Sequence, residues 1–198
     1  MSKPIDFHFP GQAGHPSPDA VALDFLRRYH IGSEEDIETD EYPDYAYFRI
    51  KGTEKKQNAL RDIVTGYNGF VVVSGDLFNV LQSFELGKTR FKRIPLLAYD
   101  RKTLISDSWY FVHFREERNC FVPSQSTGLV SQRGPDSWTV DDDSNFHLAV
   151  DPSAAEGVDI WGDRSAVKMM FFSERLHKAI TSANLNVKGM CFRRCKVI

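Results

Sequence analysis

The chain has 198 residues, of which 41% are hydrophobic, 13% aromatic and 26% charged, values typical of a globular protein. This length suits one domain or two closely packed halves, and the composition excludes disorder as the main state. The 25 Lys and Arg residues against 27 Asp and Glu give a net charge of −2, which provides no overall attraction for nucleic acid or anionic lipid.

Neither the start of the chain nor its cysteines indicate export. Residues 1–10 lack the apolar core of a signal peptide, and no apolar run approaches the roughly 20 residues that a membrane helix needs. Cys120, Cys191 and Cys195 form an odd and sparse set, unlike the even frameworks of secreted disulfide scaffolds. We expect a cytoplasmic protein that binds neither a membrane nor nucleic acid directly.

The first third of the chain predicts a helix, an acidic loop and a strand. Residues 17–19 combine a Ser cap with Pro and Asp, and apolar residues then recur at helical spacing, which predicts a helix near 18–30. Residues 33–44 hold seven acids and no basic residue, as in an exposed loop. Residues 45–51 alternate like a half-buried strand, and 53–67 fit a short helix.

The middle of the chain reads as a capped helix followed by short strands. The apolar run 70–73 meets Ser74, and the apolar spacing that follows predicts a helix over 74–84. Alternating or apolar stretches bounded by turn residues predict the remaining elements. The expected strands are 90–99, 105–114, 119–123, 137–140, 145–150 and 158–161, with a surface loop over 123–136.

The C-terminal residues repeat this arrangement. An apolar run at 167–172 meets Ser173, a helix is predicted over 173–183, and a basic strand follows at 190–194. The sequence therefore predicts two similar strand, Ser-capped helix and strand units, although coincidence is the alternative because Ser caps are common. The predicted fold class is α+β, a mostly antiparallel sheet with about three short helices near 18–30, 74–84 and 173–183.

Chemical motifs give little support to catalysis. His113, Glu116 and Cys120 resemble a metal site or a thiol with its base, but residues three apart on a strand face opposite sides. Ser74 and Ser173 sit where helix N–H groups need a cap, which predicts a structural role for both. We expect no enzyme, no catalytic residue, no metal and no cofactor; a hydrolase assembled from His113, Cys120 and Asp141 is the third-ranked interpretation.

Charge is unevenly distributed along the chain. Between Pro135 and Asp163 there are eight acids and no Lys or Arg, whereas 164–198 hold eight basic residues and one acid. The two segments can cancel in the folded protein, or an acidic face can stay free to bind a basic partner. The candidate partner contacts are the acids of the loop and of the Asp-rich turn: Glu34, Glu35, Asp36, Asp141, Asp142 and Asp143.

Several short motifs resemble one known family. Residues 172–176 (Phe-Ser-Glu-Arg-Leu) and 185–192 resemble the C-terminal signature of the eleventh-numbered immunity protein family (Imm11) of bacterial polymorphic toxin systems. Residues 72–81 resemble that family's first copy of the element, and 109–112 leading to 119–121 resemble its middle strand pair. The resemblance covers about 62–198 of what we expect to be a single domain, while 1–61 resemble nothing that can be placed.

The resemblance implies a non-catalytic protein that binds and neutralises a cognate toxin made by the same cell. Toxins that act on nucleic acid often bind phosphate through basic surfaces. The clustered carboxylates named above can mimic that phosphate. The alternative is a generic interaction or regulatory module without a toxin partner. The identity of the toxin and the oligomeric state of the chain are not predicted.

Overall fold

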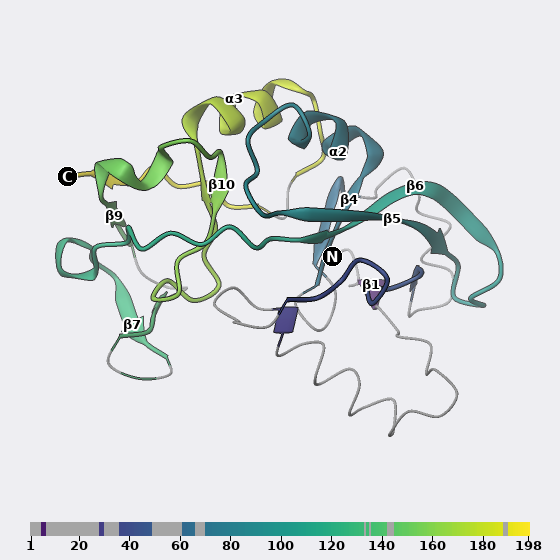
Figure 1. Ribbon diagram of the computed structural model, residues 1–198, viewed down its shortest axis with the longest axis horizontal. Coiled ribbons are helices and arrows are strands. Elements are labelled where there is room, and N and C mark those ends of the chain that lie inside the picture. The colour runs from purple at the N-terminus through teal and green to yellow at the C-terminus, as the bar shows by residue number, and fades with distance from the viewer. Residues whose placement is uncertain are drawn as a thin grey trace.

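The fold is α+β, with a curved mixed sheet and two helices packed on one of its faces (Figure 1). Helices α2 (Gly75–Leu81) and α3 (Glu174–Ser182) confirm the predicted helices at 74–84 and 173–183. The predicted helix at 18–30 lies outside the described residues apart from Arg28 and Tyr29, so the described chain has two α-helices rather than about three. The structure, a computed structural model, describes residues 5–6, 28–29, 36–48, 61–65, 70–132, 134, 136–141, 145–187 and 190–198.

Six of the described strands form the main sheet, in the order β1-β2-β5-β6-β4-β3. Strands β2 and β5 are parallel, and the other neighbouring pairs are antiparallel. These strands are β1 (Ile5–Asp6), β2 (Ala46–Phe48), β3 (Ile63–Thr65), β4 (Val71–Ser74), β5 (Arg90–Leu97) and β6 (Leu104–His113).

The remaining strands form three pairs: β7 with β8 and β10 with β11 are antiparallel, and β9 with β12 is parallel. The chain also has two short 3₁₀ helices: η2 precedes β7, and η3 lies between β9 and β10. Their bounds are η2 (Pro123–Gln125), β7 (Leu129–Ser131), β8 (Trp138–Val140), β9 (Ala149–Val150), η3 (Pro152–Ala155), β10 (Ile160–Trp161), β11 (Phe171–Phe172) and β12 (Lys196–Val197).

Two predictions in the first two thirds of the chain are wrong in detail. Residues 63–65 belong to β3 and not to a short helix, because their β-branched side chains pair along β4. The predicted loop at 123–136 contains β7, whose backbone pairs with β8. In both cases the strand forms because it pairs with another segment. The periodicity of one short segment does not reveal such pairing.

Two predicted strands are not formed. Residues 119–123 make one isolated bridge, at Phe121, because the N–H groups of Cys120 and Phe121 donate to the Asp163 carboxylate. Residues 190–194 are irregular, and the last strand, β12, begins at Lys196. The second of the two predicted units therefore lacks its final strand.

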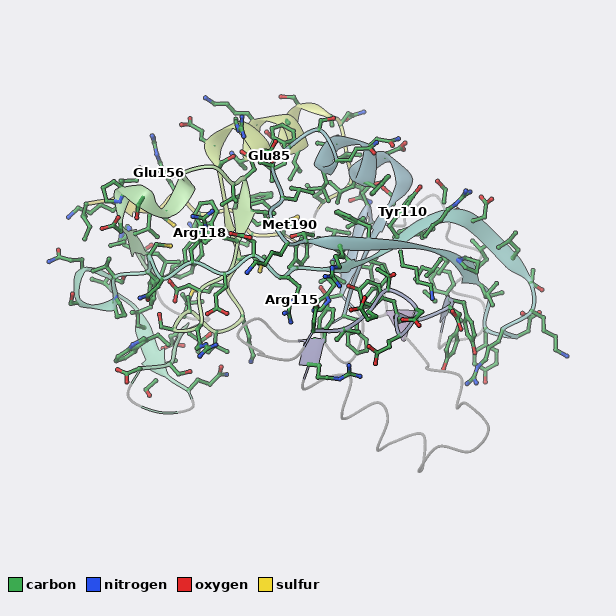
Figure 2. The ribbon with its side chains drawn as sticks, in the orientation of Figure 1. Glu85, Tyr110, Arg115, Arg118, Glu156 and Met190 are labelled. Atoms are coloured by element: carbon green, nitrogen blue, oxygen red, sulfur yellow. The ribbon has the colours of Figure 1, made fainter. Side chains whose placement is uncertain are left out.

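The main sheet is buried on both faces, which follows from the alternation of side chains along β4 and β6. On one face, Val72 and Phe111 belong to a core that includes Tyr29 and Tyr42 of the N-terminal segment. The other face packs against α2 and α3. There Tyr110 of β6 lies beneath α2, its ring 3.8 Å from that of Phe78 (Figure 2). A further core under η3 and β9–β11 is made of Cys120, Phe121, Leu148, Val150, Ala154, Val158, Trp161, Ala166 and Phe171.

The two Ser-capped helices begin in the same way. The Oγ atoms of Ser74 and Ser173 each accept the N–H three residues on, at 3.2 Å, which confirms both predicted caps. Each helix follows a hairpin, β3–β4 or β10–β11, and directly before each hairpin stands an aspartate, Asp62 or Asp159. The repeated unit is thus an aspartate, a hairpin and a Ser-capped helix.

The two aspartates join the units to each other, by contacts that we name the crossed Asp ties. Each carboxylate accepts the hydroxyl of the cap serine in its own unit. Asp62 also accepts the N–H of Asn186, which follows α3, at 2.5 Å, and Asp159 accepts the N–H of Glu85, which follows α2, at 2.9 Å. The backbone N–H groups of Asp62 and Asp159 donate in return to the carbonyls of Asn186 and Glu85. Each aspartate therefore connects the start of its own helix to the chain leaving the other helix.

Loss of either cap hydroxyl should lower stability. Ser74→Ala and Ser173→Ala each remove a helix cap and one donor to a carboxylate, so we expect the free energy of unfolding to fall by about 1–2 kcal/mol. Urea denaturation measures this change. Ser83→Ala is the matched control, because the Ser83 hydroxyl only donates to the carbonyl of Asn79 at the exposed end of α2. Equal effects of all three substitutions would contradict the role given to the ties.

Candidate functional site

Two of the six predicted contact residues lie in described segments. Asp36 is at the start of the described segment 36–48, and Asp141 follows β8. Glu34, Glu35, Asp142 and Asp143 lie outside the described residues. The structure therefore places one residue from each predicted acidic patch, and it gives the two very different surroundings.

Asp36 is held by arginines of the sheet. Its carboxylate lies 2.8 Å from Arg90 and 3.7 Å from Arg115, and it accepts the N–H of Ile37 at 2.9 Å. Desolvation alone would raise the pKa of Asp36, but the Ile37 N–H and the charges of Arg115 and Arg90 outweigh it and hold this pKa below its usual range. The negative charge of Asp36 is therefore largely balanced within the chain.

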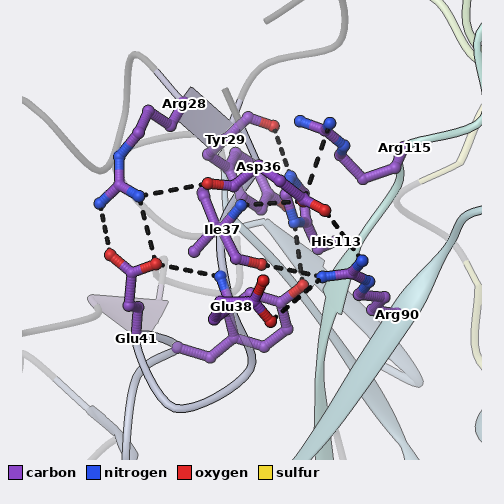
Figure 3. A network of polar contacts seen from close by, with 10 residues as sticks. Arg28, Tyr29, Asp36, Ile37, Glu38, Glu41, Arg90, His113 and Arg115 are labelled. Carbon is purple, nitrogen blue, oxygen red and sulfur yellow. Dashed lines mark hydrogen bonds and ion pairs between the residues drawn. The ribbon is translucent and has the colours of Figure 1, made fainter. Parts of the chain in front are cut away.

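Ile37, Glu38 and Glu41 of the acidic segment enter the same network (Figure 3). Arg28 binds the Glu41 carboxylate through two nitrogens, at 2.6 and 3.2 Å, and also donates to the backbone carbonyl of Asp36. Arg90 donates to the carbonyl of Ile37. The Lys92 ammonium lies 2.8 Å from the Asp44 carboxylate and donates to the carbonyl of Tyr42 at 2.9 Å. These contacts attach residues 36–44 to β5 and β6, so this segment is an anchored strap rather than a free acidic loop.

His113 lies beneath this network and is fully buried. Its Nε2 lies 3.2 Å from the carbonyl of Tyr29 and its Nδ1 lies 3.0 Å from the hydroxyl of Tyr42. Because a carbonyl can only accept, Nε2 carries the proton and the neutral ring accepts from Tyr42 at Nδ1. Burial, then the charge of Arg115, lowers the pKa of His113 to about 4. Neutral His113 therefore fixes two tyrosines of the N-terminal segment to the sheet.

The residues considered for catalysis do not meet in one site. Both nitrogens of His113 contact tyrosines, whereas the Cys120 thiol accepts the indole N–H of Trp161 at 3.2 Å in a different core. Burial raises the pKa of Cys120 to about 11, which favours the thiol over the nucleophilic thiolate. In the described part of the chain, no three His, Cys, Asp or Glu side chains are arranged to hold a metal ion.

Three acids of the segment 136–163 have partners inside the chain. Asp159 is fully buried and binds Arg175 of the basic C-terminal segment through two contacts of 2.5 Å. Asp163 is buried too and accepts the N–H groups of Cys120, Phe121 and Ser165. Asp151 accepts the N–H of Ser153 at the start of η3. Part of the uneven charge thus cancels on folding; Asp141 is exposed and also has contacts within the chain, among them its N–H with the carbonyl of Gly128.

All three cysteines are free. Cys120 is buried and Cys195 is partly buried, whereas Cys191 is exposed, because residues 190–195 form no strand. No helix in the described residues is long and apolar enough to cross a membrane.

Comparison with known families gives one match. The immunity protein family Imm11 matches residues 8–197, and the chain therefore belongs to this family. The match confirms the resemblance drawn from the motifs, and it extends to the N-terminal part that those motifs did not cover. A comparison with curated proteins finds no match.

The His113 contacts predict a pH dependence of stability. The unfolded ring titrates near pH 6.5 and the folded ring near 4, so between these values the unfolded chain binds more protons and stability falls as the pH falls. From pH 7 to pH 5 this contribution amounts to about 1–2 kcal/mol. In urea denaturation, His113→Gln should remove that part of the slope, while His147→Gln, at an exposed histidine, should keep it. Identical slopes in the two variants would contradict this assignment.

Proposed function

We propose that this protein is a non-catalytic immunity protein that binds and neutralises a cognate toxin protein. The observation that carries the proposal is the match to the immunity protein family over residues 8–197, nearly the whole chain. Immunity to a toxin made by the same cell needs a partner surface and no chemical step. The protein acts as a single domain in the compartment that the toxin attacks, which we take to be the cytoplasm.

The contacts of the titratable residues are consistent with binding rather than catalysis. Asp159, Asp163 and His113 are buried, and their polar atoms are occupied by backbone groups or side chains of the same chain. Cys120, the one thiol considered as a nucleophile, has its pKa raised by burial. These groups stabilise the fold, which leaves exposed side chains to recognise the toxin.

Co-expression tests the proposal. The product of the neighbouring gene should arrest growth when it is expressed alone in a bacterial host. Growth should continue when this protein is expressed with it. The two proteins should also co-purify in a fixed ratio. Growth arrest that persists, with no co-purification, would contradict the proposal, and rescue without co-purification would favour a regulatory module that acts without binding the toxin.

The Asp-rich turn at 141–143 is proposed as part of the toxin contact. Replacing Asp141, Asp142 and Asp143 together by Asn should slow association at low salt by about tenfold and reduce its salt dependence, because rim charges mainly steer encounter. The matched control removes three other exposed acids, through Asp76→Asn, Glu117→Gln and Glu156→Gln, the last on the η3 side of the molecule (Figure 2). Surface plasmon resonance at two salt concentrations measures both variants. Wild-type kinetics in the Asn variant would show that the turn is only solvated.

A further inference from the structure

The hairpin that joins β5 and β6 turns over residues 98–104, which we name the hairpin tip, and this tip exposes two large apolar side chains. Tyr99 is 49% exposed and Leu104 is 57% exposed, although most large apolar side chains of the described sheet are buried. Exposed large side chains scattered singly are ordinary, but two at one turn form an anchor of the kind found at the centre of protein interfaces.

The hairpin tip is held in one conformation by its own contacts. The Asp100 carboxylate accepts the N–H groups of Lys102 and Thr103 and the hydroxyl of Thr103, at 2.6–2.9 Å. The N–H of Ala98 donates to the carbonyl of Thr103, and the N–H of Arg101 to that of Ala98. A turn fixed in this way loses little conformational entropy when a partner binds it.

The hairpin reaches one edge of the molecule, where Leu97 still pairs with Tyr47 of β2. The pairing of β5 with β6 shifts register between Ile94 and Leu96 and again at Leu97, and such bulges bend a hairpin and increase its twist. Pro95, which has no N–H to donate, lies at the first of these shifts. In Figure 1 the hairpin curves past α2 to the right-hand edge of the molecule.

The charges that flank this apolar pair are positive. Lys102 is exposed, and the Arg101 guanidinium lies over the Tyr47 ring, 4.4 Å from its centroid, with the Arg101 backbone at φ 57°. The single acid of the tip, Asp100, has its carboxylate turned into the turn, where the bonds from Thr103 and Lys102 lower its pKa to about 2. The tip therefore presents an apolar centre with a cationic border.

We propose that the hairpin tip inserts Tyr99 and Leu104 into an apolar hollow of the toxin that is bordered by carboxylates. Complementary charge selects this occupant, because carboxylates on the partner match Arg101 and Lys102. The inference rests on the proposed function and adds the chemistry of the contact: the tip is its apolar centre.

The test compares the tip with an exposed apolar residue elsewhere. Tyr99→Ser combined with Leu104→Ser should weaken binding of the neighbouring gene's product at least tenfold, because apolar anchors at an interface centre contribute more than about 1 kcal/mol each. Val130→Ser is the matched control, since Val130 is 43% exposed on β7. Lys102→Glu, at an exposed side chain, tests the charge without touching the apolar pair, and Lys196→Glu on β12 is its control.

The outcomes separate the two proposals. Wild-type protein that fails to bind the toxin contradicts the proposed function, and the tip assignment with it. The tip assignment alone is overturned if the wild-type protein binds the toxin and both tip variants bind it equally well, with unchanged unfolding curves. A different occupant of the tip also overturns the assignment. If sedimentation shows a wild-type dimer that the Ser variant does not form, the tip binds a second copy of the chain. If the tip is required for binding to phosphatidylglycerol vesicles, it binds lipid.

Discussion

Two carboxylates hold the architecture together. Asp62 and Asp159 each bind the serine that begins the following helix and the backbone that leaves the other helix. Asp159 is fully buried, and a buried carboxylate without partners costs several kcal/mol, so its donors must stay in place while the protein is folded. Helices α2 and α3 therefore dock side by side on one face of the sheet, where Leu77, Leu81, Leu176 and Ile180 share a core. The N-terminal strap covers the opposite face and is fixed there by His113 and the arginine network.

The sequence predicted the local elements better than their connections. The apolar runs and Ser caps located α2, α3 and most strands of the sheet, because caps and alternation act within a few residues. The contacts that connect these elements join residues far apart in the chain. Asp62 and Asn186 are separated by 124 positions, and Arg90 and Asp36 by 54. Short-range patterns carry no sign of such contacts. For the same reason Asp36 is predicted as a free acid, although three-dimensional pairing balances its charge.

The candidate site was predictable only as a class. Motif resemblance led to the immunity family, and the family match over 8–197 confirms it. The proposed contact surface could not be read in the same way, because an exposed Tyr or Leu in a strand sequence looks like a core residue. Tyr99 and Leu104 follow the alternation of buried strands, and the bulges that carry them past the helices show only in the pairing of β5 with β6.

Hydrogen exchange of the protein, alone and in complex with the toxin encoded beside it, tests this account most directly. Binding through the hairpin tip predicts slower exchange in peptides that cover residues 97–105, with little change over α2 and α3, whose amides are already bonded within the fold. Slower exchange confined to α2 and α3, with residues 97–105 unchanged in a saturated complex, would contradict it.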